Sequence, residues 1–301
     1  MSERVRFDGR VAIVTGAGTG IGAAHARLLA ERGGAVVVND LDPEAAHSVA
    51  ADIGAAGGSA VSHAGDIATE HGAGTLVAAA LERFGRIDIV VNNAGLLRSA
   101  PFAEMTTDLW DRVVAVNLRG TFLVTHAAWP HMAAQGYGRI VSTTSNSGLL
   151  GVAGSSAYAA AKAGVWGLTR SLAIEGAPLG INVNAVAPIA YTAMSQQSKI
   201  APRAWRTGEG DEWSRRLDAA QISPVVGWLA HEDCTVSGRV FSAAGGRVAR
   251  FAMHVTEGFV AEHLTIEDVR DGQAELLTEE SGVEYHAAFE EGRDLHRRLL
   301  T

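Results

Sequence analysis

Tyr158 and Lys162 are the two residues whose types and spacing most directly suggest chemistry. They lie four residues apart in "SNSGLLGVAGSSAYAAAKAG", residues 145–164, where most other side chains are small. On a helix, this spacing places both side chains on one face, one turn apart. A phenol has a pKa of about 10, and a nearby ammonium favours its ionised form. The pair therefore predicts a general acid/base that exchanges a proton with an alcohol or a carbonyl. The alternative is that the spacing arose by chance, in which case the tyrosine packs in the core and the lysine is solvated.

An alternation of apolar runs and helix-like segments surrounds this pair. The apolar runs predict strands at 11–15, 35–40, 60–63, 87–95, 138–145, 181–188 and 238–246. Segments with helical spacing lie between them, at 23–34, 43–56, 70–84, 107–118 (or on to 134) and 157–175. Six or seven strands interleaved with helices predict an α/β fold with a doubly wound parallel, Rossmann-like sheet.

We expect one domain at 6–246, with a substrate-binding loop or lid at 190–222, and a C-terminal extension at 247–301. The stretch 190–222 mixes basic and acidic side chains without a clear period. The extension would cover either a neighbouring subunit or its own active site.

Composition excludes several classes of function. The chain has 301 residues, a net charge of −8 and a pI near 5.8, which argues against a nucleic-acid partner. Cys234 is the single cysteine, and no HExxH or His/carboxylate cluster occurs in the sequence, so we expect no metal. The N-terminus is polar, and no apolar run reaches the about 20 residues of a membrane span. These features predict a cytoplasmic protein without a membrane partner.

A glycine-rich turn follows the first expected strand. In "TGAGTGIG", Gly16, Gly20 and Gly22 let backbone N–H groups approach a phosphate at the start of the next helix. A tight connection without a ligand is the alternative. Asp40 ends the second expected strand, where a carboxylate can accept hydrogen bonds from ribose hydroxyls and would repel a 2′-phosphate. With no Lys or Arg at 17–19, the turn favours NAD over NADP. As an alternative, Asp40 would only cap the next turn.

Five segments in this order resemble the short-chain dehydrogenase/reductase family over residues 6–246. They are "TGAGTGIG", "NNAG" at 92–95, Asn117 in "VAVNLRG", Ser145 in "STTSNSG", and "YAAAK". The resemblance implies that Tyr158 is the general acid/base and that Ser145 orients the substrate oxygen. It implies that Lys162 lowers the Tyr158 pKa and bonds the nicotinamide ribose, while Asn117 holds a relay water.

The same resemblance implies a set of cofactor-binding residues. Asn92, Ala94 and Gly95 match the turn after the fourth strand, and Asp66 matches an adenine contact. The full expected set is Gly16, Thr19, Gly20, Ile21, Gly22, Asp40, Leu41, Asp66, Ile67, Asn93, Ala94, Gly95, Tyr158, Lys162, Pro188 and Thr192. Three of the site residues have plainer alternatives: Asn117 could satisfy backbone groups, Asp66 could form a turn, and Ser145 could end its strand.

Two departures from the family pattern point to one branch. Ile189 follows Pro188 where the family commonly has glycine, and the chain continues well past Gly246. Together with the segment "VVVND", these two departures make the sequence similar to the branch that includes hydroxyacyl-CoA dehydrogenase domains of peroxisomal multifunctional enzymes. Basic residues in 199–216 could meet CoA phosphates, or form a solvated charged loop.

The sequence thus predicts an NAD-dependent oxidoreductase that interconverts a secondary alcohol and a ketone, with a hydroxyacyl-CoA or another bulky hydroxy compound as the substrate that the branch implies. An NADPH-dependent 3-oxoacyl carrier-protein reductase and a non-catalytic NAD(H)-binding module are the alternatives. The resemblance also implies a homo-oligomer, a dimer or tetramer, built through the helices near 107–130 and 157–175. Trp129 and Trp166 on these helices would lie at the interface or in the core.

Overall fold

The computed structural model describes residues 4–192, 216–278 and 282–300 of the chain. The residues of the chain fall into two compact units, 1–250 and 251–301, which are described separately here. The expected boundary after residue 246 stays a prediction. Most of the charged stretch expected to form a substrate loop or lid, 193–215, lies outside the described residues.

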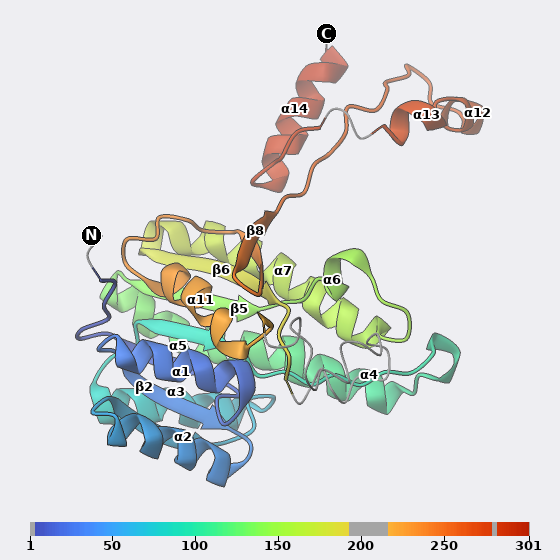
Figure 1. Ribbon diagram of the computed structural model, residues 1–301. Coiled ribbons are helices and arrows are strands. Elements are labelled where there is room, and N and C mark those ends of the chain that lie inside the picture. Colours follow the sequence, from blue (N-terminus) through green and yellow to red (C-terminus); the bar gives the residue numbers. More distant parts are fainter. Residues whose placement is uncertain (1–3, 193–215, 279–281, 301) are drawn as a thin grey trace. The chain divides into compact units, whose positions relative to one another are not determined.

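A largely parallel sheet forms the centre of the first unit (Figure 1), in the order β3-β2-β1-β4-β5-β6-β7-β8. All pairs from β3 to β7 are parallel. The strands are β1 Val11–Val14, β2 Ala35–Asp40, β3 Ser59–Ala64, β4 Ile89–Asn92, β5 Gly138–Thr143, β6 Ile181–Pro188, β7 Val240–Ala244 and β8 Arg247–Phe251. The chain order reverses between β1 and β4, and ligands of open α/β sheets bind at such a switch point. This confirms the expected Rossmann-like fold.

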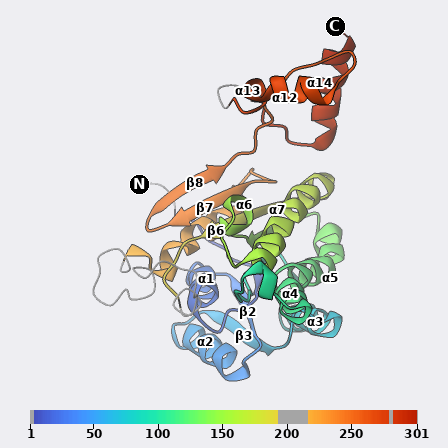
Figure 2. The ribbon, with the colours of Figure 1, turned by 90° about the vertical axis from the view of Figure 1, so that its right-hand side faces the viewer.

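Helices cover both faces of the sheet (Figure 2). The helices of this unit are α1 Gly20–Glu31, α2 Pro43–Ala55, α3 Glu70–Phe84, α4 Thr107–Val114, α5 Gly120–Gln135, α6 Ser147–Leu150, α7 Ser156–Gly176 and α11 Ser223–Ala230. Shorter helical turns lie at Phe102–Glu104, Ala177–Leu179 and Ala219–Gln221, and a π-helical segment at Ala115–Arg119.

Two apolar cores lie on opposite faces of the sheet. One packs α1, α2 and α11 on alternate residues of the strands, including Val36 and Val38, and the other packs α3, α5 and α7 on residues that include Val37. Val36, Val37 and Val38 are all fully buried, as the continuous apolar run predicts for a strand covered on both faces. The two cores hold the carboxyl ends of the parallel strands at one edge, where the candidate site lies.

The eighth strand was not expected from the sequence. It follows β7 after only Gly245 and Gly246, both of which have positive φ. A two-residue connection permits only antiparallel pairing, and positive φ at both positions is what a type I′ hairpin turn requires. The chain therefore ends its sheet in a hairpin.

The second unit contains three helices and no buried residue among those described. The helices are α12 Ile266–Asp271, α13 Gln273–Leu276 and α14 Ala288–Leu300. A bridge joins Val255 and Val283, and Thr265 caps α12 through a capping box with Asp268. Large apolar side chains such as Ile266 and Phe289 are more than four-fifths exposed. In the part of the chain that the structure describes, no helix has the length and apolar character that crossing a membrane demands.

Candidate active site

The glycine turn between β1 and α1 is closed by direct backbone packing. Gly16 has φ +60, and a Cβ on this residue would lie 2.7 Å from the Cα of Ala94. A Cβ on Gly22 would lie 2.2 Å from the Gly16 carbonyl oxygen. Thr19, the residue before α1, makes no side-chain capping hydrogen bond. The first N–H groups of α1 therefore lack a side-chain cap, which suits them to bind a pyrophosphate.

The turn after β4 is bonded to this glycine turn. The Asn93 side chain donates to the carbonyls of Thr15 and Gly16, at 3.0 Å each. The Thr15 hydroxyl accepts from the backbone N–H groups of Asn93 and Ala94, also at 3.0 Å. Asn92 instead turns inward and donates to the hydroxyl of Thr125 at 2.9 Å. The structure thus brings Asn93 and Ala94 to the switch point, while Asn92 holds α5 to the sheet.

The two expected adenosine contacts, Asp40 and Asp66, lie at the ends of neighbouring strands. An Asp40 carboxylate oxygen accepts from the Gly18 N–H at 2.9 Å, which places this carboxylate against the glycine turn. Leu41 beside it is 72% exposed. Asp66 is exposed and accepts from the Ala68 N–H at 2.9 Å, so it does form a turn. Ile67 is buried and packs at Gly120, where a Cβ would lie 2.0 Å from the Ile67 Cδ1.

Asn117 lies in the π-helical segment between α4 and α5. Its amide donates to the carbonyls of Leu96 and Val113 at 2.8 and 2.9 Å, and its oxygen accepts from the Leu96 N–H at 3.3 Å. Asn117 therefore does satisfy backbone groups. A Cβ on Gly95 would lie 3.0 Å from the Asn117 Oδ1 and 3.7 Å from the Lys162 Nζ, so Gly95 lets these groups approach each other. A π-bulge of this kind is frequent at functional sites.

Ser145 and Tyr158 lie close together, although they belong to different elements. Ser145 follows β5, and its hydroxyl lies near enough to the Tyr158 phenol on α7 to lower the pKa of that phenol. The Ser145 hydroxyl itself donates to the Asn146 side-chain oxygen at 3.3 Å. The Ser145 oxygen also accepts from the Ser147 N–H at 3.1 Å, which fixes its position. A Cβ on Gly148 would lie 2.6 Å from the backbone N of Ala163, so this glycine allows α6 to lie directly on α7.

Lys162 is fully enclosed one helical turn from Tyr158. Its Nζ lies 5.6 Å from the centre of the Tyr158 ring and donates to the Thr143 carbonyl at 2.7 Å. The Thr144 hydroxyl donates to the Lys162 carbonyl at 2.6 Å, which ties α7 to the end of β5. Thr15, Thr143 and Thr144 are supporting residues that were not expected from the sequence. Their signal was a hydroxyl side chain at the end of the first expected strand and the run "STTS" at the end of the fifth.

The pKa of Tyr158 moves in the direction opposite to the one that the spacing predicts. Burial raises the pKa of Tyr158 to about 12, and the nearby Ser145 hydroxyl only partly opposes this rise. Burial also lowers the pKa of Lys162 to about 7. The spacing indicates only the attraction between the two groups, whereas desolvation acts on both and disfavours the charged form of each. In the protein alone, the phenol is therefore a proton donor at neutral pH.

Pro188 and Thr192 place the end of β6 beside the glycine turn. Pro188 pairs with Ala243 in the sheet, and the Tyr191 N–H donates to the Leu217 carbonyl at 2.7 Å. A Cβ on Gly20 would lie 3.8 Å from the Thr192 Cγ2. The basic residues Lys199, Arg203, Arg206 and Arg215 lie outside the described residues.

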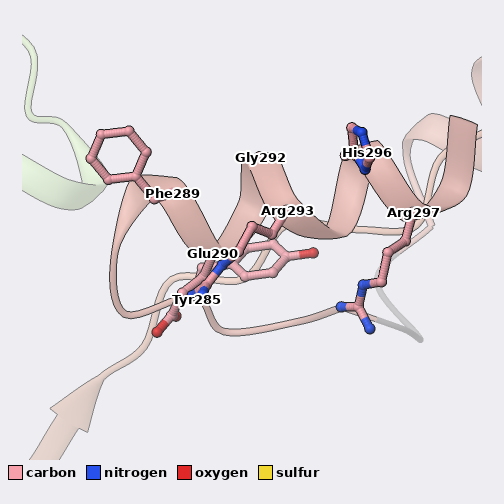
Figure 3. Close-up of a pocket in the computed structure, with 7 residues that line it drawn as sticks. All are labelled: Tyr285, Phe289, Glu290, Gly292, Arg293, His296 and Arg297. Carbon is pink, nitrogen blue, oxygen red and sulfur yellow. The ribbon is translucent and has the colours of Figure 1, made fainter.

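A separate hollow of about 1030 Å³ lies along α14 in the second unit (Figure 3), and it contains none of the expected site residues. Its lining includes Tyr285, Phe289, Arg293, His296 and Arg297. The hollow is open, and its side chains belong to a unit without described buried residues. It therefore has none of the enclosed geometry seen around Ser145 and Tyr158. Among the described residues, no group of three or more His, Cys, Asp or Glu side chains could hold a metal ion.

The fold and this geometry define a dinucleotide-binding oxidoreductase: a glycine turn at the switch point of a parallel sheet, beside a Ser/Tyr/Lys cluster. Comparison with known proteins makes the class specific. A family model described as short chain dehydrogenase matches residues 10–203. The chain belongs to this short-chain dehydrogenase/reductase family, whose members are enzymes that bind a nicotinamide dinucleotide.

Three similar proteins illustrate the range of the match. Over 284 residues the chain is 40% identical to mouse (Mus musculus) peroxisomal multifunctional enzyme type 2, with 90% of this chain and 37% of that enzyme covered. Over 251 residues it is 38% identical to a subunit of a hydroxy(phenyl)methylsuccinyl-CoA dehydrogenase from Thauera aromatica, with 80% and 97% covered. The structure of full-length peroxisomal multifunctional enzyme type 2 from Drosophila melanogaster matches with a TM-score of 0.82 and 33% identity, over 98% of this chain and 50% of that one. The chain thus spans just over a third of the mouse enzyme.

Proposed function

We propose that this enzyme interconverts a secondary alcohol and a ketone on a bulky substrate, with NAD(H) as its cofactor and Tyr158 as its general acid/base. The observation that carries the proposal is the proximity of the Ser145 hydroxyl, the Tyr158 phenol and the Lys162 ammonium, at the same sheet edge as the glycine turn. These groups come from three places in the chain, the turn after β1, the segment after β5, and α7, and a chance Tyr-x-x-x-Lys spacing would not explain their convergence.

The residues of the chain perform the proton part of the reaction. Ser145 holds the substrate oxygen by a hydrogen bond, and Tyr158 gives a proton to that oxygen when a ketone is reduced. In the reverse direction, Tyr158 accepts the hydroxyl proton. A bound nicotinamide supplies or accepts the hydride. Lys162, with Asn117 at the other side of Gly95, connects the phenol to a path for protons.

The oxidation direction needs a lower Tyr158 pKa than the protein alone provides. Burial holds this pKa near 12, so ionisation at neutral pH requires added positive charge near the phenol. Tyr158 would ionise more readily beside a bound, positively charged nicotinamide, and Lys162 would lose its proton more readily beside the same charge. We therefore expect oxidation to speed up as pH rises, while reduction uses the protonated phenol.

Asp40 supports NAD over NADP. Its carboxylate is fixed against the Gly18 N–H, at the place where a 2′-phosphate of NADP would bring like charge. No lysine or arginine stands in the turn at residues 16–22 to compensate. This opposes the alternative of an NADPH-dependent 3-oxoacyl carrier-protein reductase.

A CoA thioester is the substrate class that we favour. The Thauera relative is named as a dehydrogenase of a succinyl-CoA derivative, and the other two relatives are multifunctional enzymes of peroxisomes. Peroxisomal names among the relatives leave the expected cytoplasmic location a prediction. The expected homo-oligomer also stays a prediction. Trp166, which was expected at the interface or in the core, is only 7% exposed within one chain and therefore lies at a core position.

The test is an absorbance assay of NADH and NADPH formation over a panel of secondary alcohols and 3-hydroxyacyl-CoA thioesters. We expect turnover with NAD on at least one bulky hydroxy substrate, and a kcat/KM for NAD above that for NADP. Tight NADH binding without turnover on any panel member would favour the non-catalytic NAD(H)-binding module. Faster turnover with NADP would instead favour the carrier-protein reductase.

A further inference from the structure

A buried amide bridges the ends of β2 and β3, directly behind the two adenosine contacts. Asn39 is 1% exposed and stands opposite His63 in the parallel register of these strands. Its Nδ2 lies 3.3 Å from the His63 carbonyl and 3.2 Å from the Gly65 carbonyl. The same nitrogen lies 3.2 Å from the His63 Nδ1. Every partner of this nitrogen is therefore an acceptor, provided that His63 Nδ1 carries no proton.

The hydrogen bonds of His63 form a directed chain from β2 to α3. Because the Asn39 Nδ2 can only donate, Nδ1 of His63 accepts and its Nε2 carries the proton. That Nε2 lies 3.1 Å from the Thr75 hydroxyl, which in turn donates to the Gly72 carbonyl at 3.2 Å. Burial lowers the pKa of His63, which keeps the ring in this neutral form at physiological pH. The His63 Nε2–H and the Thr75 hydroxyl thus each meet one acceptor, whereas the two N–H groups of Asn39 are shared among three.

These hydrogen bonds hold both peptide groups of Gly65 against the end of β2. The Gly65 carbonyl accepts from Asn39, and the Gly65 N–H donates to the Asp40 carbonyl at 3.1 Å. A Cβ on Gly65 would lie 2.6 Å from the His63 ring, so the ring packs directly over this turn. Asp66 follows immediately. The position of Asp66 relative to Asp40 therefore depends on this backbone hydrogen bond and on the side chains of Asn39 and His63, which hydrogen-bond to neither carboxylate.

We propose that Asn39, His63 and Thr75, here called the adenosine clamp, are positioning residues that fix the separation of Asp40 and Asp66 and so tune affinity for the adenosine half of the cofactor. The proposal rests on the proposed function, because it takes Asp40 and Asp66 as the adenosine contacts. None of the three clamp residues was expected to act in binding. The clamp acts on cofactor affinity and leaves the proton chemistry at Tyr158 unchanged.

Thr75 offers a matched pair of variants. Thr75→Val keeps the side-chain shape and removes the hydroxyl, whereas Thr75→Ser keeps the hydroxyl and removes a methyl. Losing one such hydrogen bond costs about 0.5–1.5 kcal/mol, or about two- to twelve-fold in affinity if all of it acts on binding. We expect Thr75→Val to weaken NADH binding by about three- to ten-fold and Thr75→Ser to stay within about two-fold of the wild type. Asn39→Leu should weaken it further.

The experiment measures binding of three probes to these variants by fluorescence and calorimetry, with thermal unfolding as a check on folding. NADH and ADP-ribose carry adenosine, and reduced nicotinamide mononucleotide lacks it. The clamp predicts that Thr75→Val weakens the first two and leaves the third, and kcat at saturating NADH, unchanged. A general loss of structure would weaken all three probes.

Two results would overturn the clamp. Unchanged affinity of Thr75→Val for NADH and ADP-ribose, with normal wild-type binding, overturns the clamp alone. A wild-type protein that binds no dinucleotide overturns the proposed function and the clamp together. Should Asn39→Leu fail to fold, the Thr75 pair still decides between these outcomes.

Discussion

The two halves of the candidate site hold their functional groups by different means. Around β1, β2 and β4, positions are set by backbone contacts so close that a Cβ on Gly16 or Gly22 would overlap its neighbours. Around β5 and α7, positions are set by side chains, and the ionisable ones, Tyr158 and Lys162, have strongly shifted pKa values. The first half is built to approach a ligand, and the second is built to change its protonation state. Substitutions in the two halves should therefore fail in different ways.

Among the variants other than Tyr158→Phe, the replacement of Lys162 should have the largest effect. Lys162→Met keeps a long side chain but removes the ammonium beside Tyr158. Proton-transfer groups typically contribute about 10²- to 10⁴-fold to turnover, so we expect kcat for alcohol oxidation to fall by about 100-fold or more. Steady-state kinetics with saturating NAD measures this. A kcat within three-fold of the wild type would show that Lys162 only packs.

Gly22→Ala should instead act on cofactor binding. The new methyl would lie 2.2 Å from the Gly16 carbonyl and 2.4 Å from the Asn93 Nδ2, so the turn must move. Overpacking of this kind costs about 1–3 kcal/mol, and we expect a loss of about 10- to 100-fold in NADH affinity.

Gly74→Ala in α3 is the matched control, because a Cβ there meets nothing within 4 Å. It should leave NADH affinity unchanged and raise stability by about 0.5–1 kcal/mol through helix propensity. Equal NADH affinity for the two variants would contradict the account of the glycine turn.

Asp40→Ala should change cofactor preference more than turnover. Removing the carboxylate takes away the repulsion of a 2′-phosphate and the hydrogen bond from the Gly18 N–H. We expect the ratio of kcat/KM for NAD to that for NADP to fall by about ten-fold, the size of one charged hydrogen bond. An unchanged ratio would mean that another group selects the cofactor.

His25 should affect no step of the reaction, only the stability of the fold in acid. It is fully buried on α1, its Nδ1 lies 2.8 Å from the Ser223 hydroxyl, and burial lowers its pKa to about 3. The unfolded chain binds this proton near pH 6.5 and the folded chain does not. The His25 contribution to stability is thus full above pH 6.5 and is lost as pH falls towards 3.

Between pH 6.5 and pH 3, the His25 contribution to the free energy of unfolding changes by about 1.4 kcal/mol per pH unit. His25→Gln should flatten the difference in unfolding free energy between pH 6.5 and 4, as measured by urea titration. Parallel curves for the two proteins would show that His25 is not the responsible group.

Much of the fold could be predicted from sequence because its strands are continuous apolar runs. The run at Ala35–Asp40 shows this most clearly, and the glycine turn after β1 located the switch point. The helix α11 was missed because "SPVVGWLA" is a short apolar segment that suits a strand or a helix equally. The strand β8 was missed because Arg247–Phe251 is short, carries two arginines and contains no buried residue, so the Gly245-Gly246 turn is the signal that adds it to the sheet.

The candidate site could be predicted as a set of residues but not as an electrostatic environment. The order of Asn117, Ser145, Tyr158 and Lys162 along the chain was sufficient to choose them. Burial is a property of the folded chain, so the spacing alone gave the wrong direction for the Tyr158 pKa. The clamp at Asn39 was missed because its partners are mostly backbone carbonyls, which leave no signal in the sequence.

The most direct test of the central claim is Tyr158→Phe, which removes only the phenol oxygen beside Ser145. Two quantities are measured on the same preparation, NADH affinity by fluorescence and kcat on a substrate found in the panel. We predict NADH affinity within about three-fold of the wild type and a kcat lower by about 10³-fold or more, since phenylalanine cannot carry the proton. A variant that turns over at a near-normal rate would contradict the assignment of Tyr158 as the acid/base.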